Sequence, residues 1–322
     1  MTMLDRINKF ILKRFFPFKD WVSELRNPKI LQADIIAGIT VALVIVPQSM
    51  AYAQLAGLPP YYGLYASFLP VAIASIFGSS RQLATGPVAV VSLLTAAALE
   101  PIASNDPTGY VAYAIMLAFL VGAFQLSLGL LRMGVLVDFL SHPVVTGFTN
   151  AAAIIIATSQ LSKLFGVSVA SQEHHYQTVM NVLSESLINT HTPTLLMGLL
   201  AIFIILLFRK ISNKYPAVLI SVVITTFISW YIKFETNYEG KVIGVVPDGL
   251  PAMQLPQIDF NQLINLGTVA IAISLIGFME AISIAKAMAT QTKQRLDADQ
   301  ELIGQGLSNL AASFFQGYPV SG

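Results

Sequence analysis

The chain has 322 residues, of which 55% are hydrophobic and 11% are charged, and its formal net charge is +1. Soluble domains carry roughly 25% charged residues, so the composition excludes an ordinary soluble protein, and without a basic stripe nothing indicates nucleic-acid binding. The absence of cysteine excludes disulfides, thiolate catalysis and cysteine metal sites.

Apolar residues are gathered in long blocks, which repeatedly approach the ~20 residues that a helix needs to cross a bilayer. We interpret the polar stretch 162–193 and the stretch 234–265, rich in Pro, Asp and Asn, as loops. The sequence therefore predicts an all-α polytopic membrane protein. Its expected spans, in chain order, are 35–57, 61–78, 86–99, 110–131, 143–161, 194–208, 214–233, 266–289 and 298–315.

Basic residues indicate the orientation of the chain. The opening stretch "FILKRFFPFKDWVSELRNPK", residues 10–29, mixes aromatic and basic side chains, which is typical of a segment lying along the inner membrane surface; a partner-binding helix is the alternative. If the N-terminus is inside and 86–99 is a crossing, the opposite side keeps only Lys163, Lys233 and Lys241. The positive-inside rule then predicts a cytoplasmic N-terminus, and we expect a multi-pass protein of the cell (inner) membrane.

The stretch "RQLATGPVAVVSLL", residues 81–94, places Gly86 and Pro87 at the head of an apolar run. Glycine weakens a helix and proline lacks the N–H donor, so we expect 82–85 to be extended and a helix to begin within two residues of Pro87. A helix over 86–99 is about 21 Å long, against a ~30 Å hydrocarbon core. It would start near the midplane, where its free N–H groups and positive dipole end favour an anion. A proline-kinked span and a re-entrant loop with a structural role only are the alternatives.

Two weak internal matches indicate a repeat. "PQSMAYAQ" resembles "MEAISIAK", and "ASIFGSSRQLATGP" resembles "ASFFQGYPVSG", in the same order and at nearly the same separation. An odd number of expected spans separates the copies, so the repeat must be inverted in the membrane, an architecture common among transporters. Gly86 then corresponds to about Gly322, so we expect the sequence to be a fragment that ends where a second half-helix begins.

Four motifs carry a family resemblance: "VPQSMAYAQLAGLPPYYGLYASFLP", "SSRQLATGPVAVVSLL", "FMEAISIAKAMA" and "DQELIGQGLSNLAASFFQGYPVSG". Over about residues 30–322 the chain resembles sulfate permease (SulP) family anion transporters, with Asp299 where the family usually has Asn. The resemblance implies a seven-plus-seven inverted-repeat transporter fold with core and gate domains and short half-helices at the third and tenth spans. About the first nine spans are present. It also implies a homodimer and a cytoplasmic STAS domain after the membrane domain.

On this interpretation the chain divides into a cytoplasmic N-terminal interfacial segment and a partial transmembrane domain, 31–322. Within the latter we expect a first core part, a gate part and the start of the second core repeat. The bounds of the expected parts are 1–30, 31–132, 133–265 and 266–322.

The resemblance assigns anion binding to the first span, to the facing ends of the third and tenth spans, and to the eighth span beside them. Glutamine donates through its amide, tyrosine through its hydroxyl and a half-helix through backbone N–H groups. These donors carry no net charge, so an anion can be held and still released. A helix-packing hydrogen bond for the glutamine and simple packing for the tyrosine are the alternatives. The expected substrate-binding residues are Gln48, Tyr52, Thr85, Gly86, Pro87, Val88, Ala89, Ser321 and Gly322.

Glu280 is an acidic residue well inside an apolar span. An ionised carboxylate is costly there, so we expect it to be paired, hydrated or protonated. We interpret it as the proton-coupling residue, which takes up a proton with each anion. A permanent pair with Lys286, or with a residue beyond this sequence, is the alternative.

Other chemistry has little support in the sequence. Glu173, His174 and His175 are adjacent in sequence, so their side chains point apart, and no third metal ligand is evident. We therefore expect no metal site, and no cofactor is indicated. The motifs of hydrolases, P-loop proteins and dinucleotide enzymes do not occur, so we expect no enzyme. The leading hypothesis is proton-coupled sulfate uptake by a bacterial cell, and membrane lipids are expected as further partners. Two alternatives remain. One is uptake or exchange of bicarbonate, chloride, oxalate or a dicarboxylate, and the other is a non-transporting membrane scaffold or sensor.

Overall fold

The computed structural model describes residues 14, 17–103, 106–135, 142–169, 172, 174–212 and 216–322. These residues form helices joined by irregular connections and contain no strand beyond one isolated bridge. The elements, in chain order, are α2 (Lys19–Val22), the 3-10 turn η1 (Ser23–Arg26), α3 (Pro28–Leu55), α4 (Tyr61–Phe77), α5 (Ala89–Ala103), α6 (Pro107–Leu130), α7 (His142–Ser159), α8 (Leu161–Phe165), α9 (His175–Asn189), α10 (Thr192–Ile211), α11 (Ala217–Tyr231), α12 (Phe234–Tyr238), α13 (Leu263–Thr292) and α14 (Ala298–Phe314).

Every expected span contains a helix. By length and composition α3, α6, α10 and α13 are able to cross a bilayer, and α4, α5 and α11 are shorter apolar helices. Several ends differ from the apolar blocks because polar residues cap the helices. Asn27 accepts a hydrogen bond from the Lys29 N–H at 3.1 Å, with Pro28 as the first helical residue, so α3 begins before its apolar run.

The interpretation of 162–193 as a loop is wrong in part, because α9 forms a 15-residue helix there. Its mean polarity hides an amphipathic pattern in which apolar residues recur at helical spacing. Leu187 and Ile188, at its end, are among the most exposed apolar side chains, at 89% and 81%. The short helix α12 likewise lies inside the second expected loop, 234–265.

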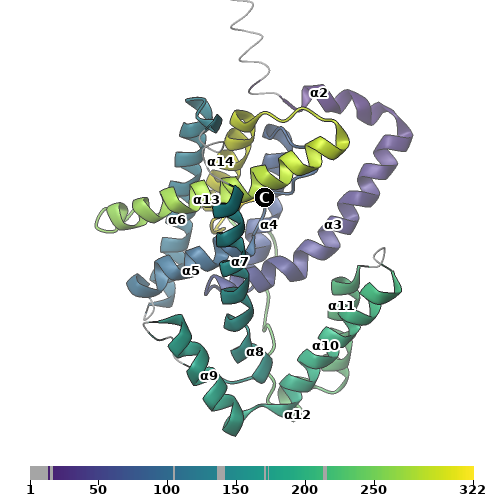
Figure 1. Ribbon diagram of the computed structural model, residues 1–322, viewed down its shortest axis with the longest axis vertical. Helices are drawn as coiled ribbons and strands as arrows, with labels where there is room; N and C mark the ends of the chain where they lie inside the picture. Colours follow the sequence, from purple (N-terminus) through teal and green to yellow (C-terminus); the bar gives the residue numbers. More distant parts are fainter. Residues whose placement is uncertain are drawn as a thin grey trace, which may run out of the picture. The chain divides into compact units, whose positions relative to one another are not determined.

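The helices group into two compact units. The described residues of 1–145 and 247–322 form unit 1, and Thr146–Val246 form unit 2. In unit 2, α10 packs against α11, and Ser221 Oγ donates to the Ala201 carbonyl at 3.1 Å. In unit 1, α14 packs along α6 and α4, α3 packs on α4, and α13 packs on α6 and α5 (Figure 1).

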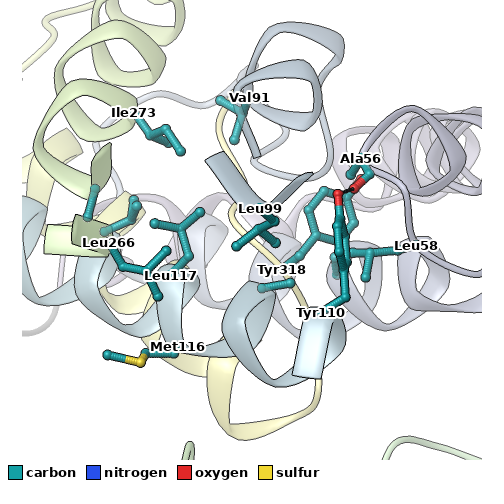
Figure 2. Close-up of a cluster of buried hydrophobic side chains, with 14 of the residues drawn as sticks. Ala56, Leu58, Val91, Leu99, Tyr110, Met116, Leu117, Leu266, Ile273 and Tyr318 are labelled. Atoms are coloured by element: carbon teal, nitrogen blue, oxygen red, sulfur yellow. Dashed lines mark hydrogen bonds between the residues drawn. The ribbon is translucent and has the colours of Figure 1, made fainter. Parts of the chain in front are cut away.

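Apolar side chains from α3, α4, α5, α6 and α13 and from the chain end form the core of unit 1 (Figure 2). Leu99 of α5, Leu117 of α6, Leu266 of α13 and the terminal Tyr318 are fully buried. The Tyr110 hydroxyl donates to the carbonyl of Ala56 at 2.9 Å. Lipid tails are as apolar as these side chains, so this core gains mainly close dispersion contacts rather than removal from water.

Glycine allows α14 to lie against α6. A Cβ atom added at Gly306 would lie 2.5 Å from the backbone nitrogen of Leu126, and one at Gly122 would lie 2.6 Å from that of Leu310. Both clashes involve backbone, which no side-chain rotation relieves. The two helices are therefore held at a distance that only small residues permit, as is common between membrane helices.

Candidate functional site

The break expected at Gly86–Pro87 is present. Residues 81–88 are not helical, and α5 begins at Ala89, two residues after Pro87. The first hydrogen bond at this end runs from the Ser92 N–H to the Val88 carbonyl at 3.0 Å. The backbone N–H groups of the first turn consequently have no acceptor within the helix.

The broken segment meets the end of the chain. The Gly86 N–H donates to the Ser321 carbonyl at 2.7 Å, and the Ser321 N–H donates back to the Gly86 carbonyl at 2.9 Å, which makes an isolated antiparallel bridge. The internal alignment pairs Gly86 with the neighbouring Gly322. The two segments expected to face one another are thus joined. We call residues 81–88 and 318–322 the first and second crossing segments.

Other helices converge on this bridge. Ser321 Oγ donates to the carbonyl of Gly277 in α13 at 2.7 Å. A Cβ atom at Gly86 would lie 3.3 Å from Ile45 Cδ1, so α3 also approaches the bridge. Ser92 of α5 and the fully buried Tyr318 share a hydrogen bond of 3.1 Å between their hydroxyl groups. Four of the expected parts of the site, on α3, α5, α13 and the second crossing segment, therefore belong to one unit.

Gln48 and Tyr52 lie one turn apart on α3. Gln48 Nε2 donates to the Tyr52 hydroxyl at 3.2 Å, and Gln48 is exposed whereas Tyr52 is half-buried. This bond stays within one helix, so it does not support the alternative in which Gln48 joins two helices.

Two of the expected site residues carry unused polar atoms. Among the described residues, Thr85 Oγ1 and Glu280 Oε2 are buried without a hydrogen-bond partner. Buried polar atoms are nearly always bonded to protein or water, so these two are available to a ligand or to water. Glu280 is half-buried on α13, three residues from the Gly277 carbonyl that binds Ser321.

Sequence reasoning missed a polar network behind the second crossing segment. The side chain of Asn309 on α14 bonds both the N–H and the carbonyl of Val320, at 2.8 and 2.9 Å, and donates to Gln125 Oε1 at 3.0 Å. Gln305, one turn earlier, is fully buried, and neither of its amide atoms has a partner among the described residues. Polar side chains inside apolar spans are a functional signal, and Gln125, Gln305 and Asn309 carry this signal as Glu280 does.

Glu301 is a second buried carboxylate that was missed. It is 2% exposed, and its Oε2 accepts the backbone N–H groups of Ser79 and Ser80 at 2.9 Å each. These serines precede the first crossing segment, so Glu301 attaches that segment to the start of α14. Asp299 lies 3.4 Å from the Arg14 guanidinium and accepts the N–H of Gly134 at 2.8 Å.

The sequence analysis expected no metal site at residues 173–175. Of these, Glu173 lies outside the described residues. His175 Nε2 shares a 2.8 Å hydrogen bond with Thr158 Oγ1 on α7. Where the structure describes the chain, no group of three or more His, Asp or Glu side chains is arranged to hold a metal ion.

Comparison with known proteins decides the family. The model of the "Sulfate permease family" matches residues 31–322. The chain belongs to the sulfate permease family. It is 38% identical over 315 residues to "Sulfate transporter 4.1, chloroplastic" of Arabidopsis thaliana, covering 95% of this chain and 45% of that protein. The chain thus spans about half the length of the curated relatives it matches.

Solved structures confirm the predicted fold class for this sulfate permease chain. The inward-facing structure of the murine Slc26a9 anion transporter matches with a TM-score of 0.90 at 24% identity, covering 97% of this chain and 55% of that one. The transmembrane domain of the cyanobacterial bicarbonate transporter BicA matches with a TM-score of 0.78 at 26% identity, covering 91% and 74%. The first of these likenesses concerns the fold alone.

Proposed function

We propose that the protein is a secondary active transporter that moves an inorganic anion, sulfate with a proton, across the cell membrane by alternating access. The observation that supports it most is the Gly86–Ser321 bridge. It holds two non-helical segments together at the start of α5, beside the unused hydroxyl of Thr85 and the unused carboxyl oxygen of Glu280.

The chemistry of the site suits a small anion. The free N–H groups of the first turn of α5 and its positive dipole end attract negative charge, and Thr85, Gln48 and Tyr52 add uncharged donors. Pro87, two residues before α5, contributes no N–H and has a fixed φ. No lysine or arginine is required among the binding residues, so the anion is held without a permanent countercharge and is released when the site opens.

Glu280 gives this site a way to couple transport to protons. A half-buried carboxyl with an unused oxygen accepts a proton more readily than it keeps a charge beside an incoming anion. Its protonation removes the repulsion between carboxylate and sulfate. We therefore propose that Glu280 is protonated when the anion binds and that both are released together.

Uptake of bicarbonate is the second candidate, because the BicA membrane domain, a bicarbonate transporter by its title, shares this fold at 26% identity. Backbone and hydroxyl donors do not by themselves distinguish sulfate from bicarbonate. Chloride, oxalate and dicarboxylates remain further candidates for the same donors.

The proposed topology places the N-terminus in the cytoplasm. Arg81, after α4, forms an ion pair with Glu24 in η1 at 2.9 Å, and Arg14 lies 3.4 Å from Asp299 at the start of α14. These contacts gather basic residues assigned to the inner side at one end of unit 1, which supports the topology. From the family we further propose a homodimer and an attached cytoplasmic STAS domain.

The test is uptake of labelled sulfate by the full-length gene product in proteoliposomes. Sulfate should enter saturably, accumulate when the outside is acidic, and be displaced by unlabelled sulfate more strongly than by bicarbonate, chloride or oxalate. Stronger displacement by bicarbonate would favour the second candidate. A folded protein that neither binds nor moves any of these anions would instead be a scaffold or sensor, and the proposal would be wrong.

A further inference from the structure

We propose that Asn309 is a positioning residue for the anion site: it fixes the second crossing segment without touching the anion. This inference rests on the proposed transport function. It concerns a residue of α14 that is fully buried and that lies outside the expected set of site residues.

The bonds of Asn309 hold Val320 in the manner of a strand partner. Its Oδ1 accepts the Val320 N–H at 2.8 Å, and its Nδ2 donates to the Val320 carbonyl at 2.9 Å. Val320 is itself buried. Both polar groups of its backbone are therefore satisfied by one side chain, and each would be left without a partner if that side chain were shortened.

Gln125 of α6 sets the orientation of the Asn309 amide. Its Oε1 accepts from Asn309 Nδ2 at 3.0 Å, while its own Nε2 donates to the Ser274 carbonyl of α13 at 3.3 Å. A flipped Asn309 amide would place an N–H group against the Val320 N–H and an oxygen against Gln125 Oε1. The network thus permits one orientation, and it connects three helices to the second crossing segment.

Val320, which Asn309 holds, lies next to the bridge between Gly86 and Ser321. Ser321, directly after Val320, forms both hydrogen bonds to Gly86 and a third to Gly277. A displacement of Val320 therefore moves the bridge, and with it the first crossing segment and the start of α5. Asn309 should therefore influence the positions of the groups that donate hydrogen bonds to the anion. A change in these positions is measured as a change in the apparent affinity for sulfate.

The variants Asn309→Ala and Asn309→Asp test this role. Alanine removes all of the bonds. Aspartate keeps the shape and the acceptor for Val320 N–H but places an oxygen against the Val320 carbonyl and Gln125 Oε1. Ser308→Ala is the matched control, because Ser308 is buried next to Asn309 but donates to the Pro70 carbonyl in α4 at 2.9 Å. All three are compared in the full-length gene product.

Sulfate exchange at equal pH on both sides gives KM and maximal rate, and thermal unfolding in detergent gives stability. We expect both Asn309 variants to raise KM about tenfold, as for the loss of well-placed hydrogen bonds, with a smaller change in maximal rate. Ser308→Ala should lower stability and leave KM unchanged. Unchanged KM in Asn309 variants that are destabilised like the control would overturn the inference.

A milder variant keeps the test decisive if both Asn309 variants fail to fold. Gln125→Ala leaves Asn309 in place and removes the acceptor that orients its amide, together with the bond to the Ser274 carbonyl. It should raise KM about threefold; an unchanged KM would again overturn the inference. If the wild-type protein itself shows no saturable anion exchange, the proposed function fails and this inference fails with it. That outcome is distinct from a working wild type with unaffected variants.

Discussion

The contact between α14 and α6 can be tested by adding one methyl group. In Gly306→Ala the new Cβ would lie 2.5 Å from the Leu126 nitrogen and 2.8 Å from the Leu126 Cα, where ordinary contacts begin at 3.4 Å. The new Cβ would lie about 0.9 Å closer to the Leu126 nitrogen than an ordinary contact allows. Because that atom belongs to the backbone, α14 has to move as a whole. Overpacking of this kind costs about 1–3 kcal/mol, partly offset by the ~1 kcal/mol that alanine gains over glycine in a helix.

Gly267→Ala is the matched control, because Gly267 lies in α13 with nothing within 4 Å of an added Cβ. It should be neutral or more stable by up to about 1 kcal/mol. The free energies of unfolding of the two variants, measured by denaturation in detergent micelles, should differ by about 1–3 kcal/mol, which isolates the packing cost. Sulfate uptake should fall only in Gly306→Ala. Equal stability of the two variants would refute the close contact and the argument that α14 positions the site.

Three further variants probe the site itself. Glu280→Gln should abolish accumulation driven by an inward proton gradient, so that uptake no longer rises as external pH falls, while exchange of internal for external sulfate persists; joint loss of both would indicate a structural role. Tyr52→Phe should raise the KM for sulfate by about threefold to tenfold, with unchanged unfolding, because it removes one uncharged donor; an unaltered KM would remove Tyr52 from the site. Glu301→Gln replaces the carboxyl acceptor of two N–H groups by an amide and should cost about 1–2 kcal/mol of stability in a detergent unfolding assay; unchanged stability would show that the Glu301 carboxyl does not hold the Ser79–Ser80 backbone.

Local chemistry explains which features the sequence could predict. Apolar blocks predict helices because a spanning backbone must satisfy its own hydrogen bonds, and the Gly86–Pro87 pair predicts a break because both residues act on their own backbone. The start of α3 at Pro28, well before the expected residue 35, depends on the Asn27 cap. The helix α9 was missed because its polar residues outweigh the pattern that makes it amphipathic.

The partners behind the site could not be predicted in the same way. The roles of Asn309 and Gln125 depend on which faces of α14 and α6 meet, and that depends on the close approach at Gly306 and Gly122. Glu301 lies at the polar start of an expected span, where a carboxylate is ordinarily solvated, and only the packing of α14 on the end of α4 buries it. The family resemblance supplied the residues that are proposed to bind the anion, but it did not supply those that hold them in place.

One helix holds both crossing segments. Near its start, α14 binds the approach to the first segment through Glu301, and two turns later it binds the second through Asn309. The bridge between Gly86 and Ser321 closes the arrangement. Because these bonds connect the two segments to one helix, we expect a change at either segment to be transmitted to the other. On the proposed function, we therefore expect the anion donors to move as one body during transport. The site should then open and close through motion around this body rather than through separation of its two segments.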